Sequence, residues 1–218
     1  GKSTIKDPTT GKEIVLHDKK KQRVINIITY DFSDITATNH MYNGNFKELV
    51  VKVQCESNFK GISDDVAGTS GTAFFINKKG NLLTNNHVVE GCKLSKINYF
   101  NKEYDANLIA TDNMLDLALL EVELKPKAFI SFSKDELKKR DLIIIAGYPL
   151  GKYLSDDLKI NEGKISSLKG FDNNSNEITV DLAINLGNSG GPIVNENGQL
   201  VAVAVSGMSK EVTEGISF

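Results

Sequence analysis

The sequence lacks tryptophan altogether and has only two cysteines and four prolines in 218 residues. Two thiols cannot build a disulfide framework of the kind that holds small secreted domains together. Neither Cys55 nor Cys92 has a second cysteine or a histidine at the spacing of a metal ligand, so the sequence indicates no zinc site. We therefore expect a chain that works without a metal or another cofactor.

Strong charge and long apolar runs are missing as well. The formal net charge is -2, which gives no reason to expect a nucleic-acid partner. No apolar run approaches the roughly 20 residues that a membrane-spanning helix needs, and the best candidate, residues 142–146, has the length of a buried strand. The chain starts at Gly1 rather than at methionine, as removal of a signal peptide or another upstream segment would leave it.

A regular series of short apolar runs dominates the sequence instead. Hydrophobic residues make up 40% of the chain and charged residues 25%, which is ordinary globular composition. From about residue 46, runs rich in Val, Ile, Leu and Phe alternate with turn residues about every ten positions, which predicts an all-β fold. The clearest runs are 49–53, 72–76, 116–122, 142–147, 178–184 and 200–205. One short helical turn is expected at Ser133, because Glu136 follows it at the spacing of a capping box.

The first 45 residues differ from the rest and are interpreted as an N-terminal arm or small hairpin. A basic run, residues 19–23, lies between the apolar stretches 14–16 and 24–28. This pattern predicts two strands joined by a solvated basic turn, with a docking patch as the alternative. His17 and His40 lie outside every motif, and we expect both at the surface.

Three short strings contain the residues that acyl transfer requires. Thr-Asn-Asn-His-Val-Val contains His87, Asp-Leu-Ala-Leu-Leu begins with Asp116, and Leu-Gly-Asn-Ser-Gly-Gly-Pro contains Ser189. A serine hydroxyl needs a base, and the base needs a third group that fixes its tautomer. We predict Ser189 as the nucleophile, His87 as the base and Asp116 as the group that orients it.

Each string also has an ordinary interpretation. A histidine beside two valines is commonly a packed side chain, an aspartate before an apolar run commonly starts a strand, and a glycine-rich string can cradle phosphate. Against a phosphate site, Pro-Ile-Val follows the serine string and predicts a strand rather than a helix. The order His, Asp, Ser is one of the known chain orders of the catalytic triad, so the three strings together favour catalysis.

Glycines on both sides of Ser189 permit a tight turn without a Cβ in the way of a substrate. Such a turn can direct backbone N–H groups at the negative charge that develops in the transition state. The predicted oxyanion hole consists of the N–H groups of Gly187, Asn188 and Ser189.

The motifs resemble those of the trypsin-like serine peptidases, and within them the bacterial HtrA/Deg branch, over about residues 46–218. Gly-Thr-Ala-Phe-Phe-Ile is similar to the strand before that branch's histidine, and Leu-Thr-Asn-Asn-His-Val-Val is similar to its histidine motif. Asp-Asn-Met-Leu-Asp-Leu-Ala-Leu-Leu resembles its aspartate motif. The string around Ser189 resembles its nucleophile motif, with Leu186 where proline is usual.

This resemblance implies a chymotrypsin-like fold of two six-stranded antiparallel β-barrels, with the active site in the cleft between them. The first barrel would cover about residues 46–130 and carry His87 and Asp116. The second would cover about residues 140–218 and carry Ser189. We expect no PDZ domain in this chain, which ends in what resembles the last strand of the second barrel, and a full-length protein could continue past that point.

The resemblance also implies where a substrate would lie. Ala183 would lie near the floor of the pocket for the residue before the scissile bond and, lacking charge, would favour a small or medium apolar side chain. An extended substrate would add as a further strand to an edge of the second barrel. That edge would consist of Val203, Ala204, Val205 and Ser206.

Two further expectations follow from comparison with the family. Asn188 stands where the digestive enzymes have an aspartate that pairs with a freed N-terminus, so we expect control by loop ordering rather than by N-terminal cleavage. Related folds bring the regions of Cys55 and Cys92 fairly close together. The two cysteines either form a disulfide, which would fit an oxidising compartment, or remain small apolar residues.

We therefore expect a serine endopeptidase that hydrolyses extended or unfolded polypeptides in protein quality control. The resemblance implies a periplasmic or otherwise extracytoplasmic location, a polypeptide as the partner and assembly into a homotrimer. A catalytically silent binding or chaperone protein on the same fold is the alternative. An esterase is a weaker one, because esterases usually have an α/β fold with a Gly-x-Ser-x-Gly string.

Overall fold

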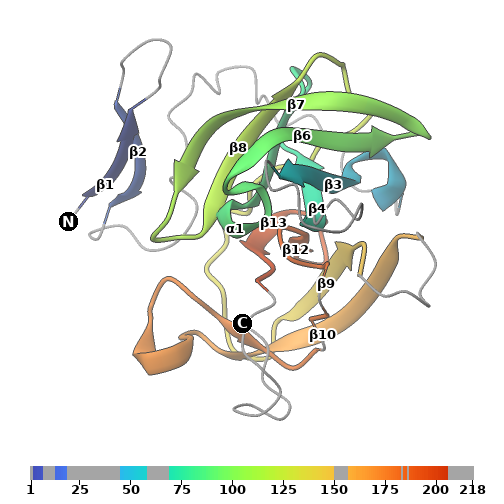
Figure 1. Cartoon of the computed structure of the whole chain (residues 1–218). Helices are drawn as coiled ribbons and strands as arrows, with labels where there is room; N and C mark the ends of the chain where they lie inside the picture. Colours follow the sequence, from blue (N-terminus) through green and yellow to red (C-terminus); the bar gives the residue numbers. More distant parts are fainter. Residues whose placement is uncertain are drawn as a thin grey trace, which may run out of the picture.

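The computed structural model describes residues 2–6, 13–18, 45–57, 69–149, 157–182, 184–185 and 187–205. Within these residues the regular structure is almost entirely β, which confirms the predicted fold class (Figure 1). The exceptions are the four-residue helix α1 (Asn86–Val89) and the 3-10 turns η3 (Phe46–Glu48) and η4 (Phe171–Asn173). No helix among the described residues is long and apolar enough to cross a membrane.

The first half of the fold is a closed antiparallel barrel. Its strands, in barrel order, are β3 (Val50–Ser57), β4 (Ser70–Phe75), β5 (Asn81–Asn85), β8 (Leu117–Val122), β7 (Lys102–Asp112) and β6 (Cys92–Tyr99). Pairing of β6 with β3 closes the barrel and leaves no free edge. The predicted six-stranded first barrel is therefore confirmed.

Apolar side chains from all six strands fill the interior of this barrel. Burial of such side chains away from water is the main favourable contribution to folding. Strands β4 and β8 are buried along nearly their whole length, because one face of each points into the barrel and the other is covered by neighbouring structure. The interior cluster includes Val51, Val53, Phe75, Leu82, Val88, Val89, Ile97 and Leu120.

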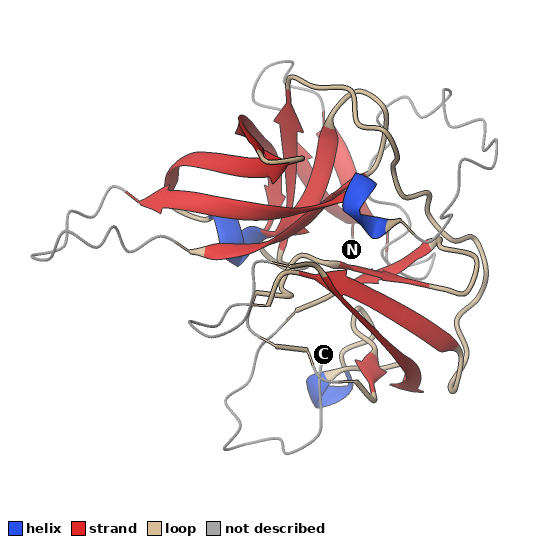
Figure 2. Ribbon diagram, turned by 90° about the vertical axis from the view of Figure 1, so that its right-hand side faces the viewer, coloured by secondary structure: helices blue, strands red, loops and turns tan. Residues whose placement is uncertain are grey.

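The second half of the fold is a curled antiparallel sheet (Figure 2). Five strands are described, in the order β11 (Thr179–Val180), β10 (Lys159–Ser167), β9 (Leu142–Gly147), β12 (Pro192–Val194) and β13 (Leu200–Val203). Residues 206–218, which were expected to contain the last strand of the second barrel, lie outside the described residues.

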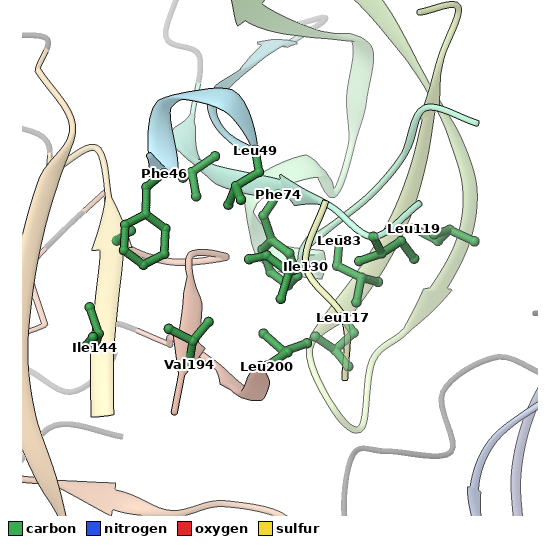
Figure 3. Close-up of a cluster of buried hydrophobic side chains, with 13 residues drawn as sticks. Phe46, Leu49, Phe74, Leu83, Leu117, Leu119, Ile130, Ile144, Val194 and Leu200 are labelled. Carbon is green, nitrogen blue, oxygen red and sulfur yellow. The ribbon is translucent and has the colours of Figure 1, made fainter. Parts of the chain in front are cut away.

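A shared apolar cluster joins the two halves (Figure 3). The first half contributes aromatic and aliphatic side chains, and the second sheet contributes aliphatic ones. The labelled members are Phe46, Leu49, Phe74, Leu83, Leu117, Leu119, Ile130, Ile144, Val194 and Leu200. The core is therefore continuous across the junction, which fixes the two halves relative to each other.

The segment that links the halves, residues 123–141, does not contain the helical turn predicted at Ser133; that prediction is wrong. Phe132 forms a parallel bridge with Leu200, and the Ser133 N–H donates to the Leu200 carbonyl. The segment is thereby held extended against β13. The Ser133 hydroxyl accepts the N–H of Asp135, so it closes a local turn instead of starting a helix.

An N-terminal hairpin pairs β1 (Lys2–Lys6) with β2 (Glu13–Asp18), and β1 lies next to β7. The predicted apolar stretch 14–16 lies within β2, which pairs with β1. The predicted turn at the basic run 19–23 and the pairing of 14–16 with 24–28 stay predictions. That run, residues 24–28, His40 and the side chain of His17 lie outside the described residues.

Candidate active site

His87 is the second residue of α1, the single helical turn that directly follows β5. The two valines after it, Val88 and Val89, are each only 2% exposed and belong to the barrel interior. Their burial holds the turn against the barrel and leaves His87 on the outer side, where 45% of its side chain is exposed. The valines that made a packed histidine plausible thus position an accessible imidazole.

Asp116 directly precedes β8 and has a φ of +50°, a left-handed conformation that is uncommon outside glycine but tolerated by aspartate. Two donors hold its backbone in place. The N–H of Asn86 donates to the Asp116 carbonyl at 3.0 Å, and the side-chain amide of Asn85 donates to the same oxygen at 2.9 Å. The residues just before His87 therefore fix the turn that carries the aspartate.

The Asp116 carboxylate binds His87 through both of its oxygens. Oδ2 lies 2.6 Å from the imidazole Nδ1, and Oδ1 accepts the backbone N–H of His87 at 2.9 Å. A carboxylate can only accept, so the neutral imidazole carries its hydrogen on Nδ1 and has its basic lone pair on Nε2. The ring is thus held in the tautomer that a general base needs.

The same contact changes the acidity of the histidine. The hydrogen bond that His87 donates to Asp116 raises the pKa of His87 above its ordinary value of 6.5, and the negative charges of Asp116 and Glu90 add to this shift. Partial burial of the ring acts in the opposite direction without cancelling it. His87 is therefore a stronger base than a free histidine.

Ser189 lies in a tight turn that the Gly191 N–H closes by donating to the Asn188 carbonyl at 2.8 Å. Gly190, the third residue of this turn, has a φ of +82°, which glycine adopts easily and other residues do not. The turn is tied to the second sheet through Ala204, which exchanges backbone hydrogen bonds with Gly190 and Gly191.

This serine turn packs directly against the strands that carry His87. A Cβ built on Gly190 would overlap the carbonyl oxygen of Thr72 and would lie 2.9 Å from the backbone nitrogen of Asn85. On the other side, a Cβ built on Gly71 would lie 2.8 Å from both γ-methyl groups of Val88 and 3.0 Å from the carbonyl oxygen of Ser189. Glycines thus let the segments of Ser189 and His87 approach each other closely.

The predicted oxyanion hole needs one correction. The N–H of Asn188 donates to the Asn185 carbonyl at 3.0 Å, so it is occupied within the loop and is not directed at a substrate. Gly187 has a φ of +94°, and its carbonyl accepts the hydroxyl of Thr72. Of the three predicted donors, the Asn188 N–H is thus engaged within the loop, and the roles of the Gly187 and Ser189 N–H groups stay predictions.

The side chain of Asn188 is buried beneath the loop, with 2% of the residue exposed. Its Oδ1 has no hydrogen-bond partner among the described residues, and it lies against Gly147, where a Cβ would be 2.7 Å away. A neutral amide is tolerated at such a position far better than an unpaired carboxylate. The chain therefore lacks the buried charge on which activation by a freed N-terminus depends.

A cleft between the two halves opens beside Asp116 and contains a cavity of about 150 Å³. The barrel contributes Leu115 and Asp116 to its wall, and the second half contributes Val203, Val205 and the loop of residues 174–178. Just over half of the lining residues are aliphatic; the others include the acidic residues Asp116 and Glu177, and neither His87 nor Ser189 lines the cavity. The aliphatic part of the wall can accept apolar side chains.

Strand β13 ends the order of the second sheet among the described residues; its last residue, Val203, and Val205, two positions beyond it, both line the cavity. Ala204, between them, is fully buried and faces the serine turn. Two residues predicted for substrate binding, Ala183 and Ser206, lie outside the described residues, as does Leu186.

Cys55 of β3 and Cys92, the first residue of β6, are joined by a disulfide with their Cα atoms 5.4 Å apart. The bond ties the segment just after α1 to β3, the strand that pairs with β6 in the barrel wall. Within the described parts of the chain, no cluster of three or more His, Cys, Asp or Glu side chains is suited to hold a metal ion.

Sequence reasoning missed several residues that build this site. Asn85 and Asn86 were noted only as part of a motif, and Thr72 only as part of a strand, although all three bond directly to the segments of Asp116 or Ser189. Two adjacent asparagines before a histidine were the available signal, because such side chains commonly hydrogen-bond to nearby backbone.

A closed β-barrel packed on a curled β-sheet, with a His–Asp pair on one and a glycine-flanked serine on the other, defines the class of chymotrypsin-like serine endopeptidase domains. Residues 71–203, more than half of the chain, match the family described as trypsin-like peptidase domain. The chain belongs to this family, and its relatives represent the HtrA/Deg branch.

Two curated proteins illustrate this relation. Serine protease Do-like HtrA of Bacillus subtilis is 34% identical over 170 residues, which cover 72% of this chain and 37% of the relative. A probable periplasmic serine endoprotease, DegP-like, of Rhizobium meliloti is 38% identical over 140 residues, which cover 61% of this chain and 27% of the relative. The chain thus spans less than half the length of these relatives.

Solved structures agree in fold. The HtrA-type protease AlgW with a tripeptide matches with a TM-score of 0.64 and 27% identity, over 77% of this chain and 54% of that one. A serine endoprotease from Yersinia pestis matches with a TM-score of 0.63 and 27% identity, over 83% and 62% of the two chains. The chymotrypsin-like arrangement of the two halves is therefore shared with HtrA-type proteases.

Proposed function

We propose that this chain hydrolyses peptide bonds through an acyl-enzyme, with Ser189 as the nucleophile, His87 as the base and Asp116 as the group that orients the base. One observation carries the proposal: both carboxylate oxygens of Asp116 bind His87, on a segment that packs against the turn of Ser189. Stabilisation of the barrel alone does not require a carboxylate that fixes the tautomer of an exposed imidazole.

In the proposed reaction, the Ser189 oxygen bonds to the carbonyl carbon of the substrate while its proton passes to Nε2 of His87. The carbonyl π electrons move to the carbonyl oxygen, and the N–H groups of Gly187 and Ser189 bind the resulting oxyanion. When the oxyanion collapses, the carbon–nitrogen bond breaks and the imidazolium gives its proton to the leaving amine. Water then cleaves the acyl ester with the same base.

The proposed substrate is an extended or unfolded polypeptide, as expected in protein quality control. The edge of β13 at Val203 supports this choice, because an extended chain can add to it through backbone hydrogen bonds. The aliphatic part of the wall of the neighbouring cavity supports a preference for small or medium apolar side chains. The structure of AlgW, one of the structural neighbours, is described as that of the protease with a tripeptide.

We further propose an extracytoplasmic setting for this activity. The Rhizobium meliloti relative is named as periplasmic, and disulfides such as Cys55–Cys92 persist in oxidising compartments. Assembly into a trimer stays a prediction from family resemblance.

A fluorophosphonate probe tests the proposal, because it bonds covalently only to an activated serine hydroxyl. Wild-type protein should be labelled, Ser189→Ala should not, and Ser166→Ala, which changes an exposed serine of β10, should be labelled like wild type. Circular dichroism would verify that each variant is folded. Folded wild-type protein that stays unlabelled would favour the alternative of a silent binding protein.

The pH dependence of kcat/KM gives a separate prediction. The base must be neutral, and Asp116 raises the pKa of His87 above 6.5, so activity should rise with pH and reach half of its plateau above pH 6.5. The sign for stability is opposite: the charged His87–Asp116 pair favours the folded state below pH 6.5, and this contribution is lost as pH rises through the folded-state pKa. A midpoint of kcat/KM at or below 6.5 would contradict the assignment.

A further inference from the structure

Thr72 forms hydrogen bonds to the turn of Ser189 in addition to those that pair its strand within the first barrel. It lies in β4, is completely buried, and faces the second half of the fold. Its backbone N–H donates to the carbonyl of Ser189 at 2.9 Å, and its hydroxyl donates to the carbonyl of Gly187 at 2.7 Å. One residue of the barrel therefore binds the loop at two points, on either side of Asn188.

The hydroxyl of Thr72 both donates and accepts a hydrogen bond. It accepts the backbone N–H of Tyr148 at 3.0 Å, in the segment that follows β9. A backbone N–H can only donate, and the Gly187 carbonyl can only accept, so the hydroxyl hydrogen points at Gly187. This chain of two hydrogen bonds runs from Tyr148 through Thr72 to the loop, and every group in it is satisfied.

Thr72 also contacts the strand that leads to His87. Its carbonyl accepts the hydroxyl of Thr84 at 2.7 Å, and Thr84 lies in β5, three residues before the histidine. Gly190 packs on this same contact, since a Cβ there would overlap both the Thr72 carbonyl and the Thr84 hydroxyl. Thr72 is thus placed between the base-bearing strand and the serine turn.

The bond to Gly187 has a particular consequence for the loop. Gly187 has no side chain and a φ of +94°, so nothing of its own restrains rotation of its peptide groups. The Thr72 hydroxyl holds the Gly187 carbonyl inward, which fixes the plane of the peptide that joins Gly187 to Asn188. Rotation of that plane would displace the neighbouring N–H groups on which the proposed oxyanion hole depends.

We propose, on the basis of the function proposed above, that the hydroxyl of Thr72 is a positioning group for the nucleophile loop. It holds residues 187–189 of the second half at a set position relative to His87 on the barrel, and it acts through Gly187 and not on the substrate. Its contribution belongs to the transition state, because it orders the groups that bind the oxyanion.

The test compares three variants of Thr72. Thr72→Val keeps the shape and the backbone N–H but removes the hydroxyl, leaving the Tyr148 N–H and the Gly187 carbonyl unpaired. We expect kcat to fall about tenfold to a hundredfold with KM unchanged. Thr72→Ser keeps the hydroxyl and should restore kcat to near the wild-type value. If Thr72→Val does not fold, Thr72→Ala takes its place in the comparison with Thr72→Ser.

A second measurement does not depend on activity. Hydrogen–deuterium exchange of the peptide that covers residues 187–191 should be faster in Thr72→Val than in wild type, and unchanged in Thr72→Ser. Thr179→Val is the matched control: it removes a threonine hydroxyl that donates to the Lys169 carbonyl in the second sheet. This control should leave both kcat and exchange in the loop unchanged.

Two results would overturn the role of Thr72. One is equal loop exchange in Thr72→Val and wild type; the other is equal impairment of Thr72→Ser and Thr72→Val, which would show that keeping the hydroxyl does not preserve activity. If wild-type protein exchanged as expected but failed to hydrolyse any peptide, the proposed function would fail, whereas the exchange data would still decide whether Thr72 holds the loop.

Discussion

Asp116→Asn should lower kcat for peptide hydrolysis about 10⁴-fold while the protein stays folded. The carboxylate oxygens accept two different hydrogens, one from the backbone N–H and one from Nδ1 of His87. An amide has one accepting oxygen and one donating NH₂ group, so it can satisfy only one of the two. If the oxygen stays on the backbone N–H, the NH₂ group faces Nδ1 and forces the imidazole hydrogen onto Nε2, where the base is needed.

The measurement is steady-state kinetics on a chromogenic peptide, with a thermal melt to verify folding. Asp105→Asn serves as the control. It makes the same substitution at an exposed residue of β7, away from the cleft. Its kcat should match that of wild type. An Asp116→Asn enzyme with full activity would show that His87 does not depend on the carboxylate for its tautomer.

Gly190→Ala should lower both stability and activity. A Cβ at this position would overlap two atoms of the first barrel, the Thr72 carbonyl oxygen and the Thr84 hydroxyl, and would press on the backbone nitrogen of Asn85. The φ of +82° adds a conformational cost for any residue with a Cβ. We expect the free energy of unfolding to fall by roughly 2–5 kcal/mol, since overpacking costs about 1–3 kcal/mol and a left-handed backbone about 1–2 kcal/mol.

The loss of kcat in this variant should exceed what its lower stability explains, because relief of the overlap moves the Ser189 turn away from the strand of His87. Thermal melts and kcat measure the two effects. Gly91→Ala is the matched control: Gly91 also has a positive φ, +70°, but a Cβ there would meet no atom within 4 Å. Equal losses in the two variants would mean that the backbone angle, and not the contact with the barrel, explains the effect.

The sequence was most informative where the chemistry depends on residue type. His87, Asp116 and Ser189 stand in strings whose residues are needed for local reasons: buried valines anchor the histidine turn, and glycines permit the serine turn. Buried strands such as β9 were also predictable, and its observed bounds, Leu142–Gly147, equal the predicted run, because all of its core-facing positions are aliphatic.

Strands β6, β7 and β10 were not among the clear runs. They are amphipathic or largely exposed, so their many polar residues obscure the apolar pattern in the sequence. In β7, for example, only two of the eleven residues are buried. Barrel closure rather than local composition keeps them in place. The helical turn predicted at Ser133 failed for a related reason, since pairing with Leu200 outweighs a short local capping signal.

The hydrogen-bonding partners of the site could not be predicted from the sequence either. Thr72 lies 117 positions before Ser189, and no pattern of residue types indicates that its hydroxyl reaches the Gly187 carbonyl. Likewise, the engagement of the Asn188 N–H within its own loop depends on backbone angles that the glycine pattern permits but does not specify. Such contacts are set by the packing of one half of the fold on the other.

The apolar cluster across the junction has a consequence for how the molecule fails. The proposed base, His87, and the proposed nucleophile, Ser189, belong to different halves, and their alignment depends on the packing of Phe46 and Phe74 of one half against Ile144 and Val194 of the other. A cavity created at Ile144 would therefore shift the position of the His87 imidazole relative to the second half without any substitution near it. Loosening of this junction is therefore expected to abolish the proposed peptide hydrolysis.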